Sequence, residues 1–399
     1  MESGLYSPPP QPRIIFEGTL LDAQAFFEKT VPVENARRAP IAQYTDGLPI
    51  NIPTEAAVAE MLTGTSHSPG EIIKNYSFDR DTGTYTQSEN PREYSRAYTA
   101  TVEKVAAIAV MAGGKPEYLP VILALAASGA PGSCPGTSGP RGNIVCISGP
   151  IAKEIGMNPG QQAMGIGNYP NRVLGRVGDL MTVCLGSCQP GLVRTDGGNP
   201  LNGVCFPEDD DGLPPGWETY REDKGGYPLT ASALGKASVK SSSVQQYAPS
   251  SYRALMGDGT GGMAHRIGVE GTPGPHNFME YIIPLYIPSE VSEPLTWVLA
   301  PNMAQGLYDY GFKTKKAFYD WAFSTYTISV GEYKTYGWWD FKGARTYGDL
   351  PDDARVPALG SRGDADDLTI IVAAGFADET AYTWSPGISR NLTPIDPWR

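Results

Sequence analysis

Three side chains in this sequence could carry chemistry near neutral pH: a thiol, an imidazole and a carboxylate. Cys205 lies in Asn202-Gly-Val-Cys-Phe-Pro207, where a glycine turn predicts a polar loop, and a loop thiol ionises more easily than a strand thiol. His276 lies in the tight turn Pro273-Gly-Pro-His-Asn277, which would hold its imidazole in place for acid–base work. If the two groups meet, the imidazole would lower the thiol pKa and create a nucleophile. The simpler interpretations are a buried thiol and a structural histidine.

Glu117 is the carboxylate of this set, and Tyr118 follows it directly. The pair sits between Gly113-Gly114 and a helix that we expect to begin at Pro120. A carboxylate near a helix N-terminus stays ionised and could act as a base. It could also only cap the helix, which is the simpler interpretation.

A polar cluster from Gly165 to Arg176 provides groups that could bind a small polar or anionic ligand. Glycines allow close backbone approach, asparagines offer amide donors and acceptors, and an arginine can fork onto a carboxylate. The residues that we expect to bind a substrate are Tyr118, Asn168, Asn171, Arg176 and Asn277. The run Gly165-Ile-Gly-Asn168 is not a dinucleotide fingerprint, because no strand directly precedes it and the third glycine is misplaced. A phosphate loop is also absent, so the sequence identifies no cofactor.

Cys184 and Cys188 form a C-x₃-C pair with three open interpretations: two buried thiols, a disulfide, or one pair of metal ligands. A structural zinc site needs four ligands in paired spacing, and no second pair exists, so we expect no metal. The five cysteines are an odd and sparse set, and the first residues lack a secretory signal. These features favour a reducing cytoplasm and argue against an obligatory disulfide.

Composition narrows the class of protein. A chain of 399 residues is long enough for two domains, and 31 basic against 43 acidic residues give a net charge of −12. That charge argues against nucleic acid and anionic membranes as partners. No apolar run reaches the length of a membrane span. The 47 glycines and 36 prolines indicate long ordered loops, and the 22 tyrosines and 7 tryptophans favour a homo-oligomer.

The pattern predicts an α/β protein with two related α/β halves, long ordered loops and an N-terminal arm. We place the arm at 1–50, the first domain at 51–206, an irregular linker at 207–245 and the second domain at 246–399. The prediction of related halves is based on a pattern that occurs twice: a strand, a proline, a short helix and a glycine at 144–156 and again at 297–311. Chance is the alternative explanation for so short a match.

Periodicity and capping residues place the individual elements. Helices are expected at 54–62, 93–111, 121–127, 151–155, 174–185, 302–310 and 315–323. Strands are expected at 143–148, 281–288, 297–300 and 368–374. The helix at 121–127 is apolar all round and should be buried.

Several runs together resemble a bacterial family. The most distinctive are Gly167-Asn-Tyr-Pro-Asn-Arg-Val-Leu-Gly-Arg176, Gly274-Pro-His-Asn277 and Asp367-Leu-Thr-Ile-Ile-Val-Ala-Ala-Gly375, and further runs lie at 52–65, 100–107, 111–121 and 148–158. In this order they resemble the large component of the family associated with UGSC-type (Sec/Cys-Gly-Ser-Cys) selenoproteins, over most of residues 50–375. The chain departs from that family at Gly114, where members often have cysteine, and in carrying the Cys184/Cys188 pair.

The resemblance implies a partner and a chemistry. Because the chain ends without the UGSC module, a separate small thiol or selenol protein is implied. That module is similar to the selenoprotein parts of glycine and proline reductases. We therefore expect an enzyme that acts on a small polar organic molecule by thiol-assisted C–X bond cleavage or addition, as a lyase, hydratase or reductase, with its site between the halves. The alternative is a non-catalytic scaffold subunit that docks a UGSC partner or builds an oligomer.

Overall fold

The computed structural model describes most of the chain. The described residues are 16–32, 40–42, 44–76, 98–129, 141–185, 203–240, 244–247, 294–325, 327–335, 343–358, 364–375, 381–384, 388 and 391–399. The predicted site residues His276 and Asn277 lie outside them, as do Cys188 and the strand expected at 281–288.

The first part of the chain begins with three helices and four short strands: α1 (Leu20–Phe27), β1 (Thr30–Val31), β2 (Ile41–Ala42), α2 (Glu55–Leu62), β3 (Ile72–Tyr76), β4 (Tyr98–Thr101) and α3 (Val102–Ala112). Next come η1 (Pro116–Tyr118), α4 (Leu119–Ala127), β5 (Arg141–Ser148), α5 (Ile151–Glu154), α6 (Tyr169–Cys184), β6 (Val204–Pro207), η3 (Asp210–Gly212), α7 (Tyr220–Gly225), β7 (Ala233–Lys240) and β8 (Val244–Tyr247).

The second part contains β9 (Leu295–Leu299), α11 (Pro301–Tyr310), α12 (Lys315–Thr325), β10 (Thr327–Ser329), α13 (Val330–Tyr333), α14 (Ala344–Tyr347) and β11 (Arg355–Pro357). It ends with η6 (Ala365–Asp367), β12 (Leu368–Val372), β13 (Ala381–Trp384), β14 (Thr393–Pro394) and η7 (Asp396–Trp398). Small two-stranded sheets pair β1 with β2, β3 with β4, and β10 with β11.

Two four-stranded mixed sheets form the centre of the fold, which confirms the predicted α/β class. Their strand orders are β14-β7-β5-β6 and β12-β9-β13-β8. Each has one parallel pair, β5 with β6 and β9 with β12, and its other described pairs are antiparallel. In each parallel pair, helices lie between the two strands along the chain, as parallel connections require.

The two sheets exchange strands. The chain runs from β7 in the first sheet to β8 at the edge of the second, and it runs from β13 in the second sheet to β14 at the edge of the first. Both halves therefore follow the same order along the chain: a strand, helices, a parallel strand and an antiparallel strand. The next strand in each half joins the edge of the other sheet. A common origin of the two halves stays a prediction.

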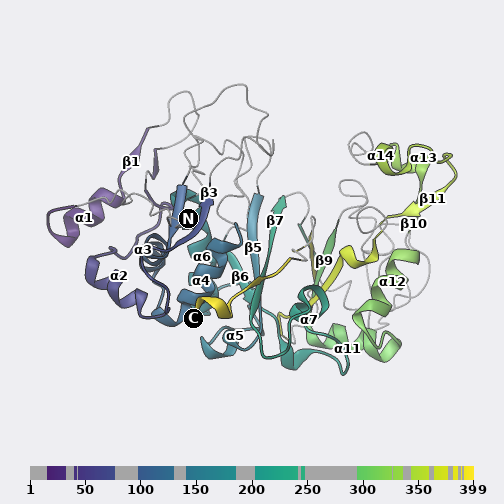
Figure 1. The fold of residues 1–399 in the computed structure, drawn as a ribbon. Helices are drawn as coiled ribbons and strands as arrows, with labels where there is room; N and C mark the ends of the chain where they lie inside the picture. Colours follow the sequence, from purple (N-terminus) through teal and green to yellow (C-terminus); the bar gives the residue numbers. More distant parts are fainter. Residues whose placement is uncertain are drawn as a thin grey trace, which may run out of the picture.

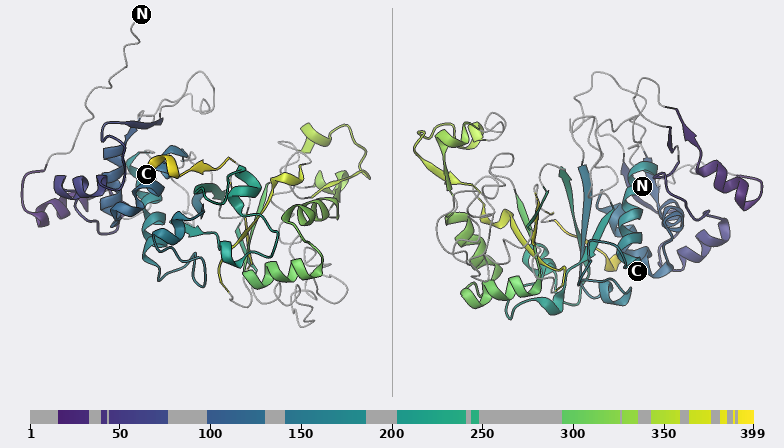
Figure 2. Two further views of the ribbon diagram at one scale, coloured as in Figure 1. Left: turned by 60° about the horizontal axis from the view of Figure 1, so that its bottom comes forward. Right: turned by 180° about the vertical axis from the view of Figure 1, so that it is seen from behind.

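The molecule has four layers, with two helical layers outside and the two sheets stacked face to face between them (Figures 1 and 2). Alternate residues of β5 show the pattern. Ile144 and Cys146 belong to a core shared with Val298 and Ile371 of the second sheet, whereas Val145 and Ile147 face the first helical layer. On the outer face of the second sheet, β9 and β12 pack against α11 and α12.

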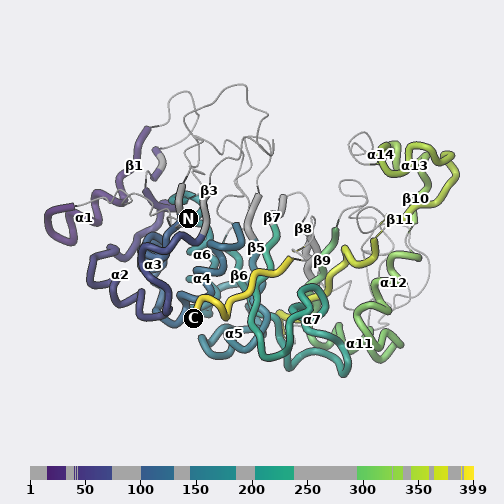
Figure 3. Tube along the Cα trace, viewed as in Figure 1, coloured from purple at the N-terminus to yellow at the C-terminus, as the bar shows by residue number. Residues whose placement is uncertain are grey.

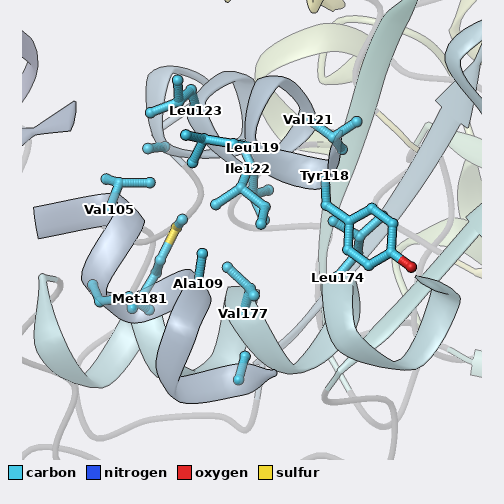
Figure 4. Packing of buried hydrophobic residues seen from close by; sticks show 14 of the residues in the cluster. Val105, Ala109, Tyr118, Leu119, Val121, Ile122, Leu123, Leu174, Val177 and Met181 are labelled. Atoms are coloured by element: carbon cyan, nitrogen blue, oxygen red, sulfur yellow. The ribbon is translucent and has the colours of Figure 1, made fainter. Parts of the chain in front are cut away.

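The first helical layer consists mainly of α3, α4 and α6. Figure 4 shows how side chains from all three helices interdigitate, among them Val105, Ala109, Ile122, Val177 and Met181. Eight of the nine residues of α4 are buried, as its uniformly apolar sequence predicts.

Two helix starts differ from the predictions because local capping decides them. The helix expected from residue 93 begins only at Val102, since Thr101 is its N-cap and residues 98–101 form β4. The helix expected from Leu174 begins earlier, at Tyr169, because Asn168 caps it. Residues 207–245, interpreted as an irregular linker, include α7, β7 and the start of β8.

The described part of the N-terminal arm and the C-terminal segment are attached to the first helical layer. The described part of the arm is held against α6 by a bidentate ion pair between Arg176 and Asp46. The Arg176 Nε lies 2.8 Å and an Nη nitrogen 3.1 Å from the carboxylate oxygens of Asp46. Figure 3 shows the C-terminal segment returning from the second sheet to the side of α4. There Ile395 is fully buried in the first core.

Candidate functional site

The carboxyl ends of β5, β6 and β12 meet at one edge of the stacked sheets. Directly after β6, the N–H of Glu208 donates to the carbonyl of Ile147 in β5 at 2.8 Å. The next N–H, of Asp209, donates to the carbonyl of Val372 in β12, also at 2.8 Å. In α/β proteins, ligands favour such strand ends.

A cavity of about 280 Å³ lies at these strand ends, beside α5 and α7. Figure 1 shows both helices together at the lower edge of the sheets. Its charged lining residues are Lys153, Glu208, Asp209, Asp210, Asp211 and Arg221. We call it the strand-end cavity.

Glu208 is a buried carboxylate that ties the two sheets together. It accepts hydrogen bonds from the Ser148 hydroxyl at 2.7 Å and from the N–H of Tyr220 at 2.7 and 2.9 Å. Lys315, at the start of α12, places its Nζ 3.4 Å from Glu208 and donates to the carbonyl of Ile370 at 2.9 Å. Burial raises the pKa of the Glu208 carboxyl, and Lys315 is the main influence in the opposite direction.

Arg221 is buried, with 1% of its side chain exposed. Its two Nη nitrogens donate to the Asp210 carboxylate at 2.7 and 3.0 Å, to the Ser148 hydroxyl at 3.0 Å and to the carbonyl of Leu229 at 3.1 Å. Its Nε–H has no hydrogen-bond partner among the described residues. A buried donor without a partner is uncommon and calls for an explanation.

Asp209 differs from the carboxylates beside it. Asp210 pairs with Arg221, and Asp211 pairs with Lys153 at 2.7 Å. Asp209 is half-buried and accepts a hydrogen bond from the Gly212 N–H at 3.2 Å, but within the described part of the chain no cationic side chain pairs with it. Burial raises the pKa of its carboxyl, and the charges of Asp211 and Asp210 raise it further.

Strained backbone lies next to the cavity. Ala374, two residues after β12, has φ of 78°, and its N–H donates to the carbonyl of Pro159, which lines the cavity, at 2.8 Å. The next residue, Gly375, has φ of 68°, and a Cβ there would lie 2.4 Å from the backbone nitrogen of Gln161. Such strain is concentrated at functional sites in proteins.

The prediction of Cys205 as an accessible loop nucleophile is wrong in its structural basis. Cys205 lies within β6, is 3% exposed and faces the helical core, so burial raises its pKa far above the usual range. Cys146 is buried between the sheets and its pKa is raised for the same reason. Burial raises the pKa of Cys184 to about 12, and its thiol lies 3.7 Å from the carbonyl of Tyr44.

The polar cluster at the start of α6 is structural rather than open to a ligand. Asn168 caps the helix, and its amide donates to the carbonyl of Gly156 at 3.2 Å. Asn171 is 2% exposed; its amide nitrogen donates to the carbonyls of Asn158 and Ala163, at 2.9 and 2.8 Å. These two side chains therefore hold the loop before α6 in place. Arg176, the third member, holds the arm, as described above.

Glu117 and Tyr118 are separated from the strand-end cavity. Glu117 is exposed, lies 3.9 Å from Lys115 and lines a more open depression of about 460 Å³ together with Glu154 and Arg399. Tyr118 is buried beside α4 and α6, where burial raises its phenol pKa (Figure 4). Glu117 is exposed whereas Cys205 is enclosed in the core, so these two residues do not line one accessible site.

The sequence held one signal for the cavity that our prediction missed. The apolar run from Val204 to Pro207 is followed at once by four carboxylates, Glu208 to Asp211, which is the pattern of a buried strand ending at a polar site. Arg221 and Ser148 carry no comparable signal, because only the fold brings them there.

Comparisons with protein-family models, curated proteins and solved structures found no match to this chain. The resemblance to the UGSC-associated family therefore stays a proposal. Within the described ranges, no group of three or more His, Cys, Asp or Glu residues is arranged to hold a metal ion. In the same ranges, every helix is too short or too polar to span a bilayer.

Proposed function

We propose that this protein is an enzyme that binds a small polar organic molecule in the strand-end cavity and that Asp209 transfers a proton there. One observation carries the proposal: Asp209 is the half-buried cavity carboxylate that lacks a cationic partner among the described residues, and its pKa is raised. A carboxylate with a raised pKa is a stronger base than a solvated one and suits general acid–base catalysis.

Of the lyase, hydratase and reductase chemistries expected from the sequence, the proposal keeps C–X bond cleavage or addition by a lyase or hydratase. In the elimination, the Asp209 carboxylate accepts a proton from carbon, the C–H electron pair forms the double bond, and the group X leaves with the electrons of the C–X bond. In the addition, X donates an electron pair to form the C–X bond, and the electron pair of the double bond takes the proton from protonated Asp209 at the neighbouring carbon. The buried Arg221 and Glu208 would fix the shape and charge of the cavity during either step.

The carboxylate replaces the thiol in this proposal because of the geometry of the described thiols. Cys146 and Cys205 are enclosed in separate cores, and the Cys184 thiol is directed to a backbone carbonyl. A thiol or selenol brought by a separate UGSC-type partner remains compatible with this site and is the partner that we propose from the resemblance.

The test is turnover of a pooled set of small polar metabolites, followed by mass spectrometry, with wild-type protein and two variants. Asp209→Asn should lower turnover by roughly 10²–10⁴-fold, the usual contribution of a general acid or base. Asp211→Asn is the matched control, since Asp211 is 77% exposed and already paired with Lys153, and it should stay near the wild-type rate. Equal rates for Asp209→Asn and the wild type would exclude the proposed role.

A scaffold role is the second candidate, and α1 is the observation that favours it. Leu20 and Leu21 are 66% and 81% exposed, and Phe16, whose ring centroid lies 5.6 Å from that of Phe26 in the same helix, is 37% exposed. Exposed apolar side chains that lie together mark contact surfaces in many proteins. An oligomer or a UGSC partner that covers α1 would be lost in the double variant Leu20→Ser/Leu21→Ser, as sedimentation would reveal.

A further inference from the structure

Residues 395–399 lie across the first half of the fold, and we call them the C-terminal strap. Ile395 is fully buried in the first core, and its N–H donates to the carbonyl of Ser232 at 2.8 Å. Further along the strap, two of its carbonyls accept hydrogen bonds from the hydroxyls of Thr65 and Ser66, at 2.7 and 2.6 Å. The strap therefore connects the chain before β7 with the loop after α2.

The strap also holds α5, which forms one wall of the strand-end cavity. Asp396 accepts from the N–H of Ser232 at 2.7 Å, and the Ser232 hydroxyl accepts from the N–H of Ile151, the first residue of α5, at 3.2 Å. At the other end of α5, Arg399 donates to the Glu154 carboxylate at 2.7 Å. The two residues between these contacts line the cavity. Figure 1 shows the C-terminus close to α5.

His67 attaches the strap to the loop after α2. Its Nε2 lies 2.7 Å from the carbonyl of Pro397, its Nδ1 lies 2.9 Å from the Glu71 carboxylate, and its ring packs against Trp398 with the centroids 4.9 Å apart. Both polar partners are acceptors. A neutral imidazole has a single N–H, so only the imidazolium donates to both. Loss of the proton leaves one of the two acceptors facing a ring nitrogen that cannot donate to it.

Glu71 is the charged group that His67 contacts. Further charged side chains lie on the elements packed against this loop, at Glu103, Lys104, Asp396 and Arg399. The pKa of His67 is raised first by the Pro397 carbonyl and then by Glu71. Because the folded-state pKa is raised, both contacts are complete below the ordinary value of 6.5 and are lost as pH rises through the folded value.

We infer that the C-terminal strap is a pH-sensitive device: it fixes α5 at the wall of the strand-end cavity while His67 is protonated, and it releases α5 when His67 loses its proton. Pro397 and Arg399 are exposed, so the strap can open locally while the cores stay folded. The inference concerns the mobility of α5 and does not depend on the proposed role of Asp209, so either can fail alone.

Hydrogen exchange followed by mass spectrometry tests the inference on the full chain. Peptides that cover α5 and the strap are followed from about pH 5.5 to 8.5, with exchange times corrected for the intrinsic effect of pH on amide exchange. Both should lose roughly tenfold in protection across this range, because a hydrogen bond to a charged group is worth about that factor. A peptide from α11, which packs on the second sheet, is the internal reference and should not change.

Two variants test the assignment to His67. His67→Gln cannot become charged, so its strap and α5 peptides should show the same low protection at every pH. Glu71→Gln keeps an acceptor beside Nδ1 but removes its charge, so the response should remain with a midpoint moved toward the ordinary pKa of 6.5. The wild-type comparison needs no variant, so it decides the first part even where a variant does not fold.

Several results would overturn the inference. They are a strap without a pH response, an α5 that stays protected while the strap opens, an equal change in the α11 peptide, and a His67→Gln protein that keeps the response. An unchanged midpoint in Glu71→Gln would also contradict it, because the charge of Glu71 is part of what holds His67 protonated.

Discussion

Asp209 and Glu208 are adjacent carboxylates with opposite surroundings. Glu208 is surrounded by donors from β5, α7 and α12, so it joins elements of both halves of the fold. Asp209 accepts from the backbone N–H groups of Gly212 and Asp211 and has two acidic neighbours, so no cation holds its carboxylate ionised and it can take a proton. The chemistry and the stability of this edge are thus assigned to different residues.

The ion pair of Glu208 and Lys315 gives a stability prediction. Glu208→Gln leaves the Lys315 ammonium buried without its counter-charge, so unfolding free energy should fall by about 3–5 kcal/mol. The double variant Glu208→Gln/Lys315→Met removes both charges and should recover much of that loss. Chemical denaturation measures both values. As a control, Glu154→Gln removes an exposed partner of Arg399 and should cost no more than about 1 kcal/mol. A Glu208→Gln protein as stable as this control would contradict the structural role.

The buried cysteines give a labelling prediction. Because Cys146 and Cys205 are enclosed and burial raises the pKa of each thiol, iodoacetamide should leave both unmodified in the native protein at pH 7.5 and should modify both after unfolding. Peptide mass spectrometry identifies the sites. Rapid native labelling of Cys205 would restore it as a candidate nucleophile.

At the scale of elements, helices were the most predictable part of the fold. Their apolar periodicity and caps, such as Thr54 before α2 and Thr314 before α12, are local signals that the structure confirms. The starts of α3 and α6 were misplaced, because the N-caps Thr101 and Asn168 set where each helix begins and periodicity alone does not. The short edge strands β8 and β14 had no sequence signal, because each pairs with a strand that is far away in the sequence.

One pH-dependent contact joins the C-terminal segment to the loop after α2. His67 Nδ1 lies 2.9 Å from the Glu71 carboxylate, and Nε2 lies 2.7 Å from the carbonyl of Pro397. Both partners are hydrogen-bond acceptors, so each ring nitrogen must carry a proton and the imidazolium is favoured. The pKa of His67 is therefore raised, first by the Pro397 carbonyl and then by Glu71.

Because the folded-state pKa is raised, the stabilisation is fully present below the ordinary value of 6.5 and is lost as pH rises through the folded value. The Tm difference between the wild type and His67→Gln should therefore be larger near pH 5.5 than near pH 8.5. Thermal denaturation at the two values measures it. A difference that is constant or that grows with pH would exclude a charged His67 in this contact.

At the scale of the whole molecule, the two sheets are connected at several places. They share a core, they exchange the edge strands β8 and β14, and the ion pair of Glu208 and Lys315 bridges them. The sequence predicted the repeated strand–proline–helix pattern but placed a linker at 207–245, where the structure has part of the exchange. The composition of residues 207–245 suggested a loop. Part of this segment forms strands instead, because pairing with strands far apart in the sequence outweighs its local preference.

Strand exchange predicts that β5 and β9 open together. Hydrogen exchange followed by mass spectrometry at increasing sub-denaturing urea should give the same free energy of opening for peptides from both strands, because neither sheet is complete without the other half. Peptides from α1, which is largely exposed, should exchange earlier and serve as the internal reference. Opening of the two strands at clearly different free energies would indicate independent domains.

The most direct measurement is a ¹³C NMR titration of the Asp209 carboxyl, assigned by its loss in Asp209→Asn. We expect it to titrate above the ordinary value of 3.8, because burial and the charges of Asp211 and Asp210 oppose ionisation, and to shift when a small polar ligand binds in the strand-end cavity. A titration at or below 3.8 with no response to any small polar ligand would contradict a role for Asp209 as the proton-transferring carboxylate of the strand-end cavity.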